Sequence, residues 1–362
     1  MAADRRLERQ AALAARLGES GVAALLVSHA PNVRYLTGFS GSAGLLLLRA
    51  DRSTLLTDFR YQAQAVAEAG SVADVVVDAV SLWERLKRLL IDQPVETLGF
   101  EAHIMTARDA ERLAGLGCTR PVPVTDLVER LRAIKSPEEV ASIQAAVNLA
   151  QDALRETLPA IRPGQTEFEI AAQLEGALRR RGSEWHPFPT IVASGPRSAL
   201  PHARSSSRTV EPGDLLVIDF GAQVDGYCAD ITRTFVVGAK ADERQRTVHG
   251  IVQEAQLRAR TGVRAGMTGR EADALARDLI AARGFGEAFG HSLGHGLGLE
   301  VHEAPRLAAT AESVLPAGAV VTIEPGLYFS GWGGVRIEDD VLLGPEGPIC
   351  LSDGLTELVE LA

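Results

Sequence analysis

The sequence has few cysteines, no long apolar run and no excess of basic residues, and each shortage excludes a class of protein. Its three cysteines, Cys118, Cys228 and Cys350, lie far apart and form no CxxC pair. A disulfide framework or a zinc–thiolate site is therefore not expected, and a reducing cytoplasm is the expected location. No apolar stretch approaches the roughly 20 residues that span a bilayer. The first ten residues carry several charges and precede no long apolar segment, which argues against a secretion signal.

Acidic residues outnumber basic ones. The 362 residues include 37 Lys and Arg and 47 Asp and Glu, which gives a net charge of −10. A general nucleic-acid binder needs a basic surface, so this class is also excluded. Hydrophobic residues make up 46% of the chain, enough for a packed core. At roughly 100–200 residues per domain, the length favours two domains.

The first half of the chain, residues 1–125, alternates between short apolar segments and amphipathic segments. This alternation predicts an α/β domain. We expect helices over residues 6–17, 59–69 and 83–90, and strands over residues 23–28, 44–48, 53–57, 72–77 and 97–100.

A linker helix is expected over residues 126–135, followed by a second domain over 136–362. Ser136, Pro137 and Glu139 have the spacing of a capping box with proline at the first helical position, which predicts the start of a long helix. We expect further helices over 167–181, 241–260 and 269–282, and antiparallel strands over 215–220, 229–237, 320–324 and 335–343, with the helices packed on one side.

Two aspartates in the second domain stand out. Asp219 continues the apolar face of a strand that also carries Leu215 and Val217, and a carboxylate there is costly unless its charge is compensated. Taken alone, Asp219 is explained as a residue that caps a turn. Asp230 lies eleven residues later, beyond a turn at Asp225-Gly226, so a hairpin can bring the two carboxylates together. Two carboxylates at close range repel unless a cation lies between them.

Two glutamates repeat this pattern. Glu324 ends an apolar strand, and Glu338 shares a strand face with Arg336. A surface salt bridge between Glu338 and Arg336 is the simpler interpretation, but four such carboxylates in one domain point to a common role. The segment 289–303 adds three of the eight histidines, among glycines that allow a ligand to approach the backbone closely.

Four carboxylates and one imidazole suit two divalent cations. Their four negative charges balance two M²⁺ ions, and such a pair can activate water for hydrolysis. Oxygen-rich ligands with one nitrogen favour manganese and also accept cobalt, iron or zinc.

Four segments resemble, in this order, the dimetal site of the pita-bread metallopeptidases, the family of methionine aminopeptidase, aminopeptidase P, prolidase and creatinase. These are VIDFGAQVDGYCADITRTF, GHSLGHGLGLEVHE, TIEPGLY and GVRIEDD. The resemblance implies a curved, mainly antiparallel sheet with flanking helices. NVRYLTGFSGSAG and the linker LRAIKSPEEV extend it to the creatinase-like N-terminal domain of the prolyl branch. The implied metal ligands are Asp219, Asp230, His295, Glu324 and Glu338.

The prolyl branch implies a reaction and roles for further residues. The reaction is hydrolysis of the bond between the first residue of a peptide and a following proline. Glu324 would carry the proton, His291 and His302 would donate hydrogen bonds at the scissile group, and His202 would line the substrate pocket. Arg336 would orient the carboxylates or bind a substrate carboxylate.

Several alternatives stay open. Tyr227 and Thr232 either support the ligands or are ordinary strand residues. An aminopeptidase P-like enzyme and a prolidase-like dipeptidase share the same ligands, and the dipeptidase needs a cationic group, such as Arg336, Arg34 or Arg60, for the carboxylate of its substrate. A non-catalytic binding protein of this fold would have lost ligands, whereas all five are present here. The family also implies a homodimer.

Overall fold

The computed structural model describes residues 4–362, so the first three residues of the charged N-terminal segment lie outside the description. The chain forms two compact units, Met1–Arg132 and Ala133–Ala362. The division falls inside the expected linker, over residues 126–135. No helix among residues 4–362 has both the length and the apolar character that crossing a bilayer requires.

The first unit is built on a six-stranded mixed sheet with the order β4-β3-β2-β1-β5-β6. The strands β1 and β5 pair in parallel, whereas β1 and β2 are antiparallel. This arrangement agrees with the predicted α/β domain. The strands are β1 (Ala24–Val27), β2 (Gly44–Arg49), β3 (Ser53–Thr57), β4 (Asp74–Val77), β5 (Thr97–Glu101) and β6 (Arg120–Val124), and the helices are α1 (Arg5–Leu17), α2 (Ala30–Thr37), α3 (Gln62–Ala69), α4 (Leu82–Asp92), α5 (Ala107–Ala114) and α6 (Glu129–Arg132).

Three differences from the predicted elements have physical reasons. The strand β6 was not predicted because it contains Pro121 and Pro123, which an edge strand tolerates. The helix α2 was also not expected, because it spans only eight residues and carries Pro31 in its first turn. The expected linker helix over residues 126–135 is only a four-residue turn, α6, and Asp126 before it adopts a positive φ of 57°.

The second unit contains two larger sheets and two short hairpins. One sheet has the order β19-β11-β8-β7 and the other β13-β12-β14-β17-β18. Nearly all pairs are antiparallel, as predicted. The strands are β7 (Ile191–Ser194), β8 (Leu215–Phe220), β9 (Gln223–Val224), β10 (Tyr227–Cys228), β11 (Ile231–Val237), β12 (Gly294–Gly296), β13 (Glu303–Leu307), β14 (Val320–Ile323), β15 (Gly326–Phe329), β16 (Gly333–Arg336), β17 (Asp339–Leu343), β18 (Pro348–Cys350) and β19 (Val359–Leu361).

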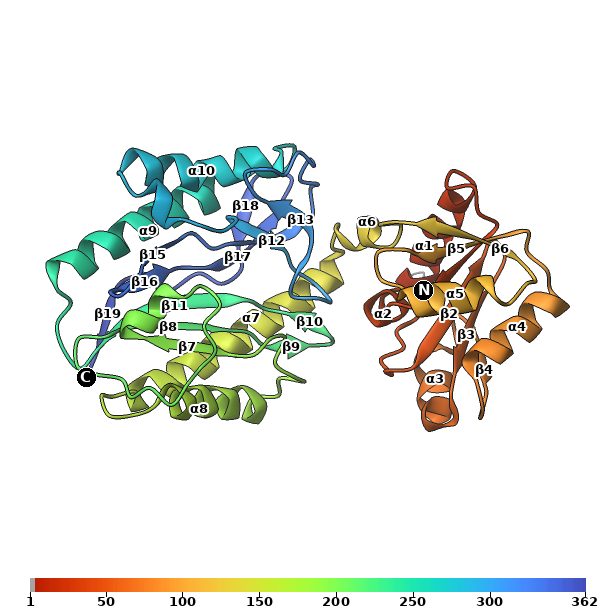
Figure 1. Ribbon diagram of the computed structural model, residues 1–362, viewed down its shortest axis with the longest axis horizontal. Helices are drawn as coiled ribbons and strands as arrows, with labels where there is room; N and C mark the ends of the chain where they lie inside the picture. The colour runs from red at the N-terminus through yellow and green to blue at the C-terminus, as the bar shows by residue number, and fades with distance from the viewer. Residues whose placement is uncertain (1–3) are drawn as a thin grey trace. The chain divides into compact units, whose positions relative to one another are not determined.

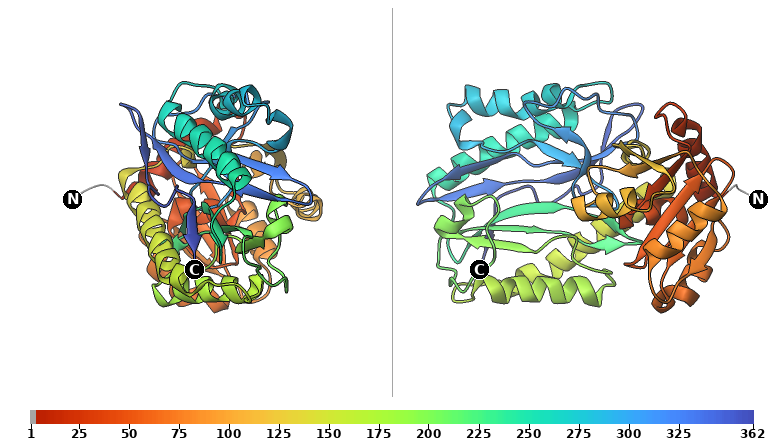
Figure 2. Two further views of the ribbon diagram at one scale, coloured as in Figure 1. Left: turned by 90° about the vertical axis from the view of Figure 1, so that its left-hand side faces the viewer. Right: turned by 45° about the vertical axis from the view of Figure 1, so that its right-hand side comes forward.

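Two helix pairs flank these strands on opposite sides, rather than on one side as expected (Figures 1 and 2). The first pair is α7 (Pro137–Thr157) and α8 (Glu167–Arg180), and the second is α9 (Glu243–Gly262) and α10 (Gly269–Ala282). The capping box of Ser136 and Glu139 is present at the start of α7. Each pair packs on its own hydrophobic cluster because the strands have apolar residues on both sides.

The register of β8 directs its residues to two different environments. Leu216, Ile218 and Phe220 belong to the hydrophobic cluster that packs against α7 and α8. The alternate residues face the other way, and Asp219 is among them. In the antiparallel pair of β8 and β11, Asp219 lies opposite Thr232, so the hairpin places the end of one strand beside the start of the other.

A buried histidine in α9 generates a prediction about stability and pH. His249 is 3% exposed, and burial lowers its pKa from 6.5 to about 4, although Glu357 acts in the opposite direction. His249 in the unfolded chain therefore binds a proton below pH 6.5, whereas His249 in the folded chain binds it only near pH 4. Stability is full above pH 6.5 and falls as the pH decreases through this window.

We expect the wild-type protein to lose about 2 kcal/mol more unfolding free energy than His249→Gln between pH 7.5 and 5.0. Urea unfolding at both pH values measures this difference. His103→Gln, at an exposed position, is the matched control. Equal pH dependence in the wild type and His249→Gln would contradict the prediction.

Candidate active site

The residues proposed from the sequence as ligands and substrate contacts line one cavity of about 1410 Å³ in the second unit. Asp219 comes from β8, and Asp230 directly precedes β11. His295 lies on β12, Glu324 follows β14, and Glu338 precedes β17. The two larger sheets thus contribute groups to the same space. His202, His291, His302 and Arg336 line the same cavity.

Three of these groups are close enough to share one cation. One ligand atom each of Asp230, His295 and Glu338 lies within 4.8 Å of the others. His295 Nε2 is 3.4 Å from Glu324 Oε1 and 3.8 Å from Asp230 Oδ2. The hairpin expected from the eleven-residue spacing is present, because Asp219 pairs across the strands with Thr232, two residues after Asp230.

Burial and mutual repulsion dominate the electrostatics of the site. Burial raises the pKa of Asp230 well above its ordinary value, and Glu338 and Asp219 raise it further. The pKa of Glu338 is raised by burial and by its neighbours Glu324 and Asp219. Burial raises the pKa of Glu324 to about 8. Asp219 Oδ1 and Asp230 Oδ1 are buried without a hydrogen-bond partner, which is the condition that bound cations would relieve.

The imidazole of His295 is oriented as a ligand. Its Nδ1 lies 3.0 Å from the carbonyl oxygen of Gly296, which can only accept, so Nδ1 carries the hydrogen. Burial lowers the pKa of His295 to about 4, and the ring is therefore neutral. Its Nε2 lone pair then faces Glu324 and Asp230 at 3.4 and 3.8 Å, an arrangement that fits a metal ion between them.

A hydrogen-bonded chain supports the carboxylates from one side. Arg336 Nη2 lies 2.6 Å from Asp219 Oδ2, and Arg336 Nε donates to the hydroxyl of Thr232. Thr232 Oγ1 in turn donates to Glu338 Oε2 at 2.6 Å. Thr232 therefore supports a predicted ligand. Tyr227, the other residue considered for this role, donates instead to Glu139 at the start of α7.

Tyr328, which the sequence motifs did not single out, connects Arg336 to His291. Arg336 Nη1 donates to Tyr328 Oη at 2.9 Å, and Tyr328 Oη lies 2.9 Å from His291 Nε2. Because His291 Nδ1 donates to the carbonyl of Ser292, its Nε2 accepts from Tyr328. Both ring nitrogens of His291 are thus engaged within the protein, which differs from its expected role as a donor to substrate. The TIEPGLY segment contains Tyr328, but its place in an apolar strand suggests ordinary packing.

Arg306 is a second residue that the sequence analysis did not single out. It lies on β13, is exposed and lines the cavity. By contrast, Arg336 is 3% exposed, and its guanidinium donates to Asp219, Thr232, Tyr328 and the carbonyl of Pro201. Four of the five N–H donors of Arg336 are therefore engaged within the protein, whereas the guanidinium of Arg306 makes no hydrogen bond within residues 4–362 and is available.

Comparisons with known proteins agree with this arrangement. Residues 141–345 match metallopeptidase family M24, and residues 9–134 match the creatinase/prolidase N-terminal domain. The uncharacterized peptidase YqhT of Bacillus subtilis is 42% identical over 95% of this chain and 97% of its own.

Two solved structures cover almost the whole chain. A Xaa-Pro dipeptidase from Bacillus anthracis superimposes with a TM-score of 0.95 and 40% identity, over 98% of this chain and 100% of its own. An X-Pro aminopeptidase from Thermotoga maritima gives a TM-score of 0.91 and 39% identity, over 98% and 99%. The family expected from the sequence motifs is confirmed: the chain belongs to metallopeptidase family M24 and carries a creatinase/prolidase N-terminal domain.

Proposed function

We propose that this protein is a two-metal exopeptidase that removes the first residue from peptides with proline at the second position. The observation that carries the proposal is one cavity in which four buried, mutually repelling carboxylates meet a neutral imidazole. The names of the similar dipeptidase and aminopeptidase support the Xaa-Pro specificity. The proposed ligands are Asp219, Asp230, His295, Glu324 and Glu338, and the donor set favours manganese.

The residues fit two divalent cations because their charges balance and two carboxylate oxygens lack partners. When bound, such cations act as Lewis acids toward a carbonyl and lower the pKa of water. Glu324 is the carboxylate best placed to carry a proton to the leaving nitrogen, since its side chain is 17% exposed against 7% for Asp230.

The remaining residues of the cavity bind the substrate or orient other side chains. His302 is exposed to the cavity and its ring lies 4.3 Å from that of His295, centroid to centroid, so we assign it the hydrogen bond to the developing oxyanion. His202 lines the cavity, and we assign it to the substrate pocket. Arg336 orients Asp219, and His291 fixes Tyr328 and through it Arg336. The nitrogen of proline carries no hydrogen, so the pocket needs no acceptor there.

Glu338→Gln tests the metal site. The amide preserves the volume but removes the charge that balances a cation. We expect metal uptake and peptidase activity to fall together by at least about 100-fold, because even outer partners of metal ligands cost 10–100-fold. Metal content by mass spectrometry and hydrolysis of an Xaa-Pro peptide measure both. Glu346→Gln, in an exposed loop, is the control. Turnover by a variant shown to contain no metal would refute the two-metal proposal.

His302→Ala tests the oxyanion assignment. This substitution should leave both metal ions bound and lower kcat by roughly 10²-fold or more, because the donor acts on charge that develops in the transition state. Steady-state kinetics with parallel metal analysis separate the two effects, and Glu346→Ala, in an exposed loop, is the control. Loss of metal with the loss of activity would instead make His302 part of the metal site.

A prolidase-type dipeptidase is the second candidate, and Arg306 favours it because a free guanidinium in the cavity can bind the terminal carboxylate of a dipeptide. The cavity volume favours longer peptides. Its value of about 1410 Å³ exceeds the roughly 300–1,000 Å³ typical of small-molecule sites.

A peptide-length series with manganese separates the two candidates. We expect cleavage of both Xaa-Pro and Xaa-Pro-Xaa, with Arg306→Gln raising KM for the dipeptide by about 10-fold or more, because one charge-assisted hydrogen bond is lost. The KM for the longer peptide should change little. Arg270→Gln, at a side chain that is 58% exposed, is the control. Cleavage of Xaa-Pro alone would establish the dipeptidase.

We further propose that the protein acts in the cytoplasm as a homodimer. All three cysteines are free within residues 4–362, which suits a reducing compartment. A solution mass near twice 38.5 kDa by light scattering would support the dimer.

A further inference from the structure

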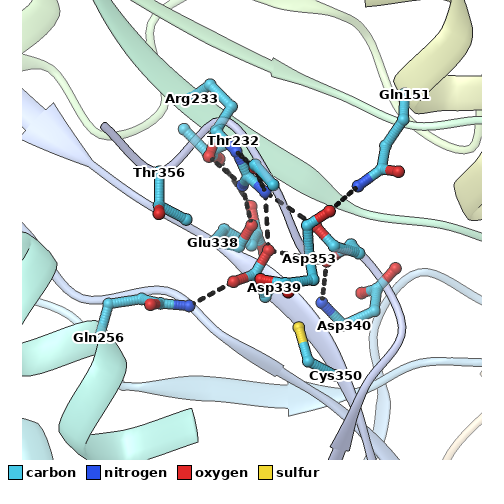
Figure 3. A network of polar contacts seen from close by, with 12 residues as sticks. Gln151, Thr232, Arg233, Gln256, Glu338, Asp339, Asp340, Cys350, Asp353 and Thr356 are labelled. Carbon is cyan, nitrogen blue, oxygen red and sulfur yellow. Dashed lines mark hydrogen bonds and ion pairs between the residues drawn. The ribbon is translucent and has the colours of Figure 1, made fainter. Parts of the chain in front are cut away.

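A second buried charge cluster, around Arg233 and Asp339, lies next to the proposed ligand Glu338 (Figure 3). Thr232 and Glu338 contact each other at the cavity. The residues that directly follow them, Arg233 and Asp339, form an ion pair of 2.7 Å that does not line the cavity. The same two chain segments therefore carry proposed site groups on one side and a buried salt bridge on the other.

Arg233 binds the backbone of the proposed site. It is 1% exposed, and its Nη1 donates to the carbonyl of Glu338 at 2.5 Å and to that of Thr232 at 2.9 Å. Its other nitrogens donate to the carbonyls of Ser352 and Gly354 near the C-terminal end. One guanidinium thus fixes the main chain of Glu338 relative to β11 and to the segment 352–354.

Asp339 extends the contacts to a second proposed ligand. It is fully buried, and its Oδ1 accepts from Ser352 Oγ at 2.8 Å. Ser352 Oγ accepts from the backbone nitrogen of Asp340, and Asp340 Oδ2 accepts from the backbone nitrogen of Asp230 at 3.1 Å. The cluster therefore reaches the backbone of Asp230 as well as that of Glu338.

The helix α9 completes the cluster. Gln256 donates to Asp339 Oδ2 at 2.5 Å, and Arg260 Nη1 lies 3.2 Å from the same oxygen. The carboxylate of Asp339 thus contacts Arg233 on β11, Ser352 near the C-terminal end, and two residues of α9. A buried ion pair of this kind contributes little net stability compared with apolar residues of the same volume, so its geometry is the stronger reason for its presence.

We propose that Arg233 and Asp339 are positioning residues that set the places of Glu338 and Asp230 in the metal centre, with the segment 352–354 as part of the same support. The inference rests on the proposed function. Residues that orient metal ligands from behind typically change metal affinity by 10–100-fold, and the same order is expected here.

The test measures metal binding directly, without relying on activity. Co²⁺ is titrated into metal-free wild type, Arg233→Lys and Asp339→Asn, with affinity by calorimetry and ligand geometry by the visible spectrum of the bound ion. Both variants should bind Co²⁺ about 10–100-fold more weakly and give a shifted spectrum. The control is Asp214→Asn, which disrupts the Arg208–Asp214 pair outside the cavity and should match the wild type in both measurements.

The outcomes are distinguishable. Wild-type affinity and an unchanged spectrum in both variants would overturn the inference, even if the metal-free variants unfold at lower urea concentration. If neither variant folds, Ser352→Ala decides, because it removes one hydroxyl and no charge. Weaker binding with a shifted spectrum then supports the inference, and wild-type behaviour overturns it. A wild type that binds no Co²⁺ would instead refute the proposed function itself.

Discussion

The structure of the second unit depends on how four buried carboxylates can coexist. Asp219, Asp230, Glu324 and Glu338 crowd one cavity. Burial together with repulsion from neighbouring carboxylates raises the pKa of Asp230, Glu324 and Glu338 and so disfavours their charged forms. One guanidinium, that of Arg336, pairs directly with Asp219. A single positive charge cannot balance four negative ones, so the site either takes up protons or holds cations. The second solution explains why an imidazole in its neutral form faces the same space.

The antiparallel sheets are what allow such an unfavourable site to form. Alternate residues of β8 pack into the hydrophobic cluster that contacts α7 and α8. This packing anchors the strand. The opposite face is then free to present Asp219. A shift of register by one residue would bury Asp219 in the apolar cluster and expose Ile218 to the cavity, so the apolar residues fix where the carboxylate lies. Folding and site geometry are thus specified by the same alternation.

The sequence predicted what depends on local patterns and missed what depends on tertiary contacts. The capping box at Ser136 and the strand that carries Asp219 follow from spacing and periodicity, and both are present. Local pattern could not show that Tyr227 turns toward α7 or that Tyr328 connects His291 with Arg336. It also could not show that Arg336 spends four of its donors on groups within the protein, because Asp219, Thr232 and Pro201 lie far from it in the sequence.

The neighbours Glu338 and Asp339 have different roles, because Asp339 is paired within the protein whereas Glu338 is a proposed metal ligand. These neighbours are equally inaccessible to bulk solvent, at 2% and 0% exposure. Asp339 receives two guanidinium groups, an amide and a hydroxyl from the protein itself. Glu338 receives one hydrogen bond, from the hydroxyl of Thr232, and the repulsion from Glu324 and Asp219 exceeds the attraction from Arg336. Since an uncompensated buried charge costs far more than a paired one, the charge of Glu338 calls for a further partner, which a bound cation would supply. The paired neighbour is then the fixed point against which a bound cation can be held.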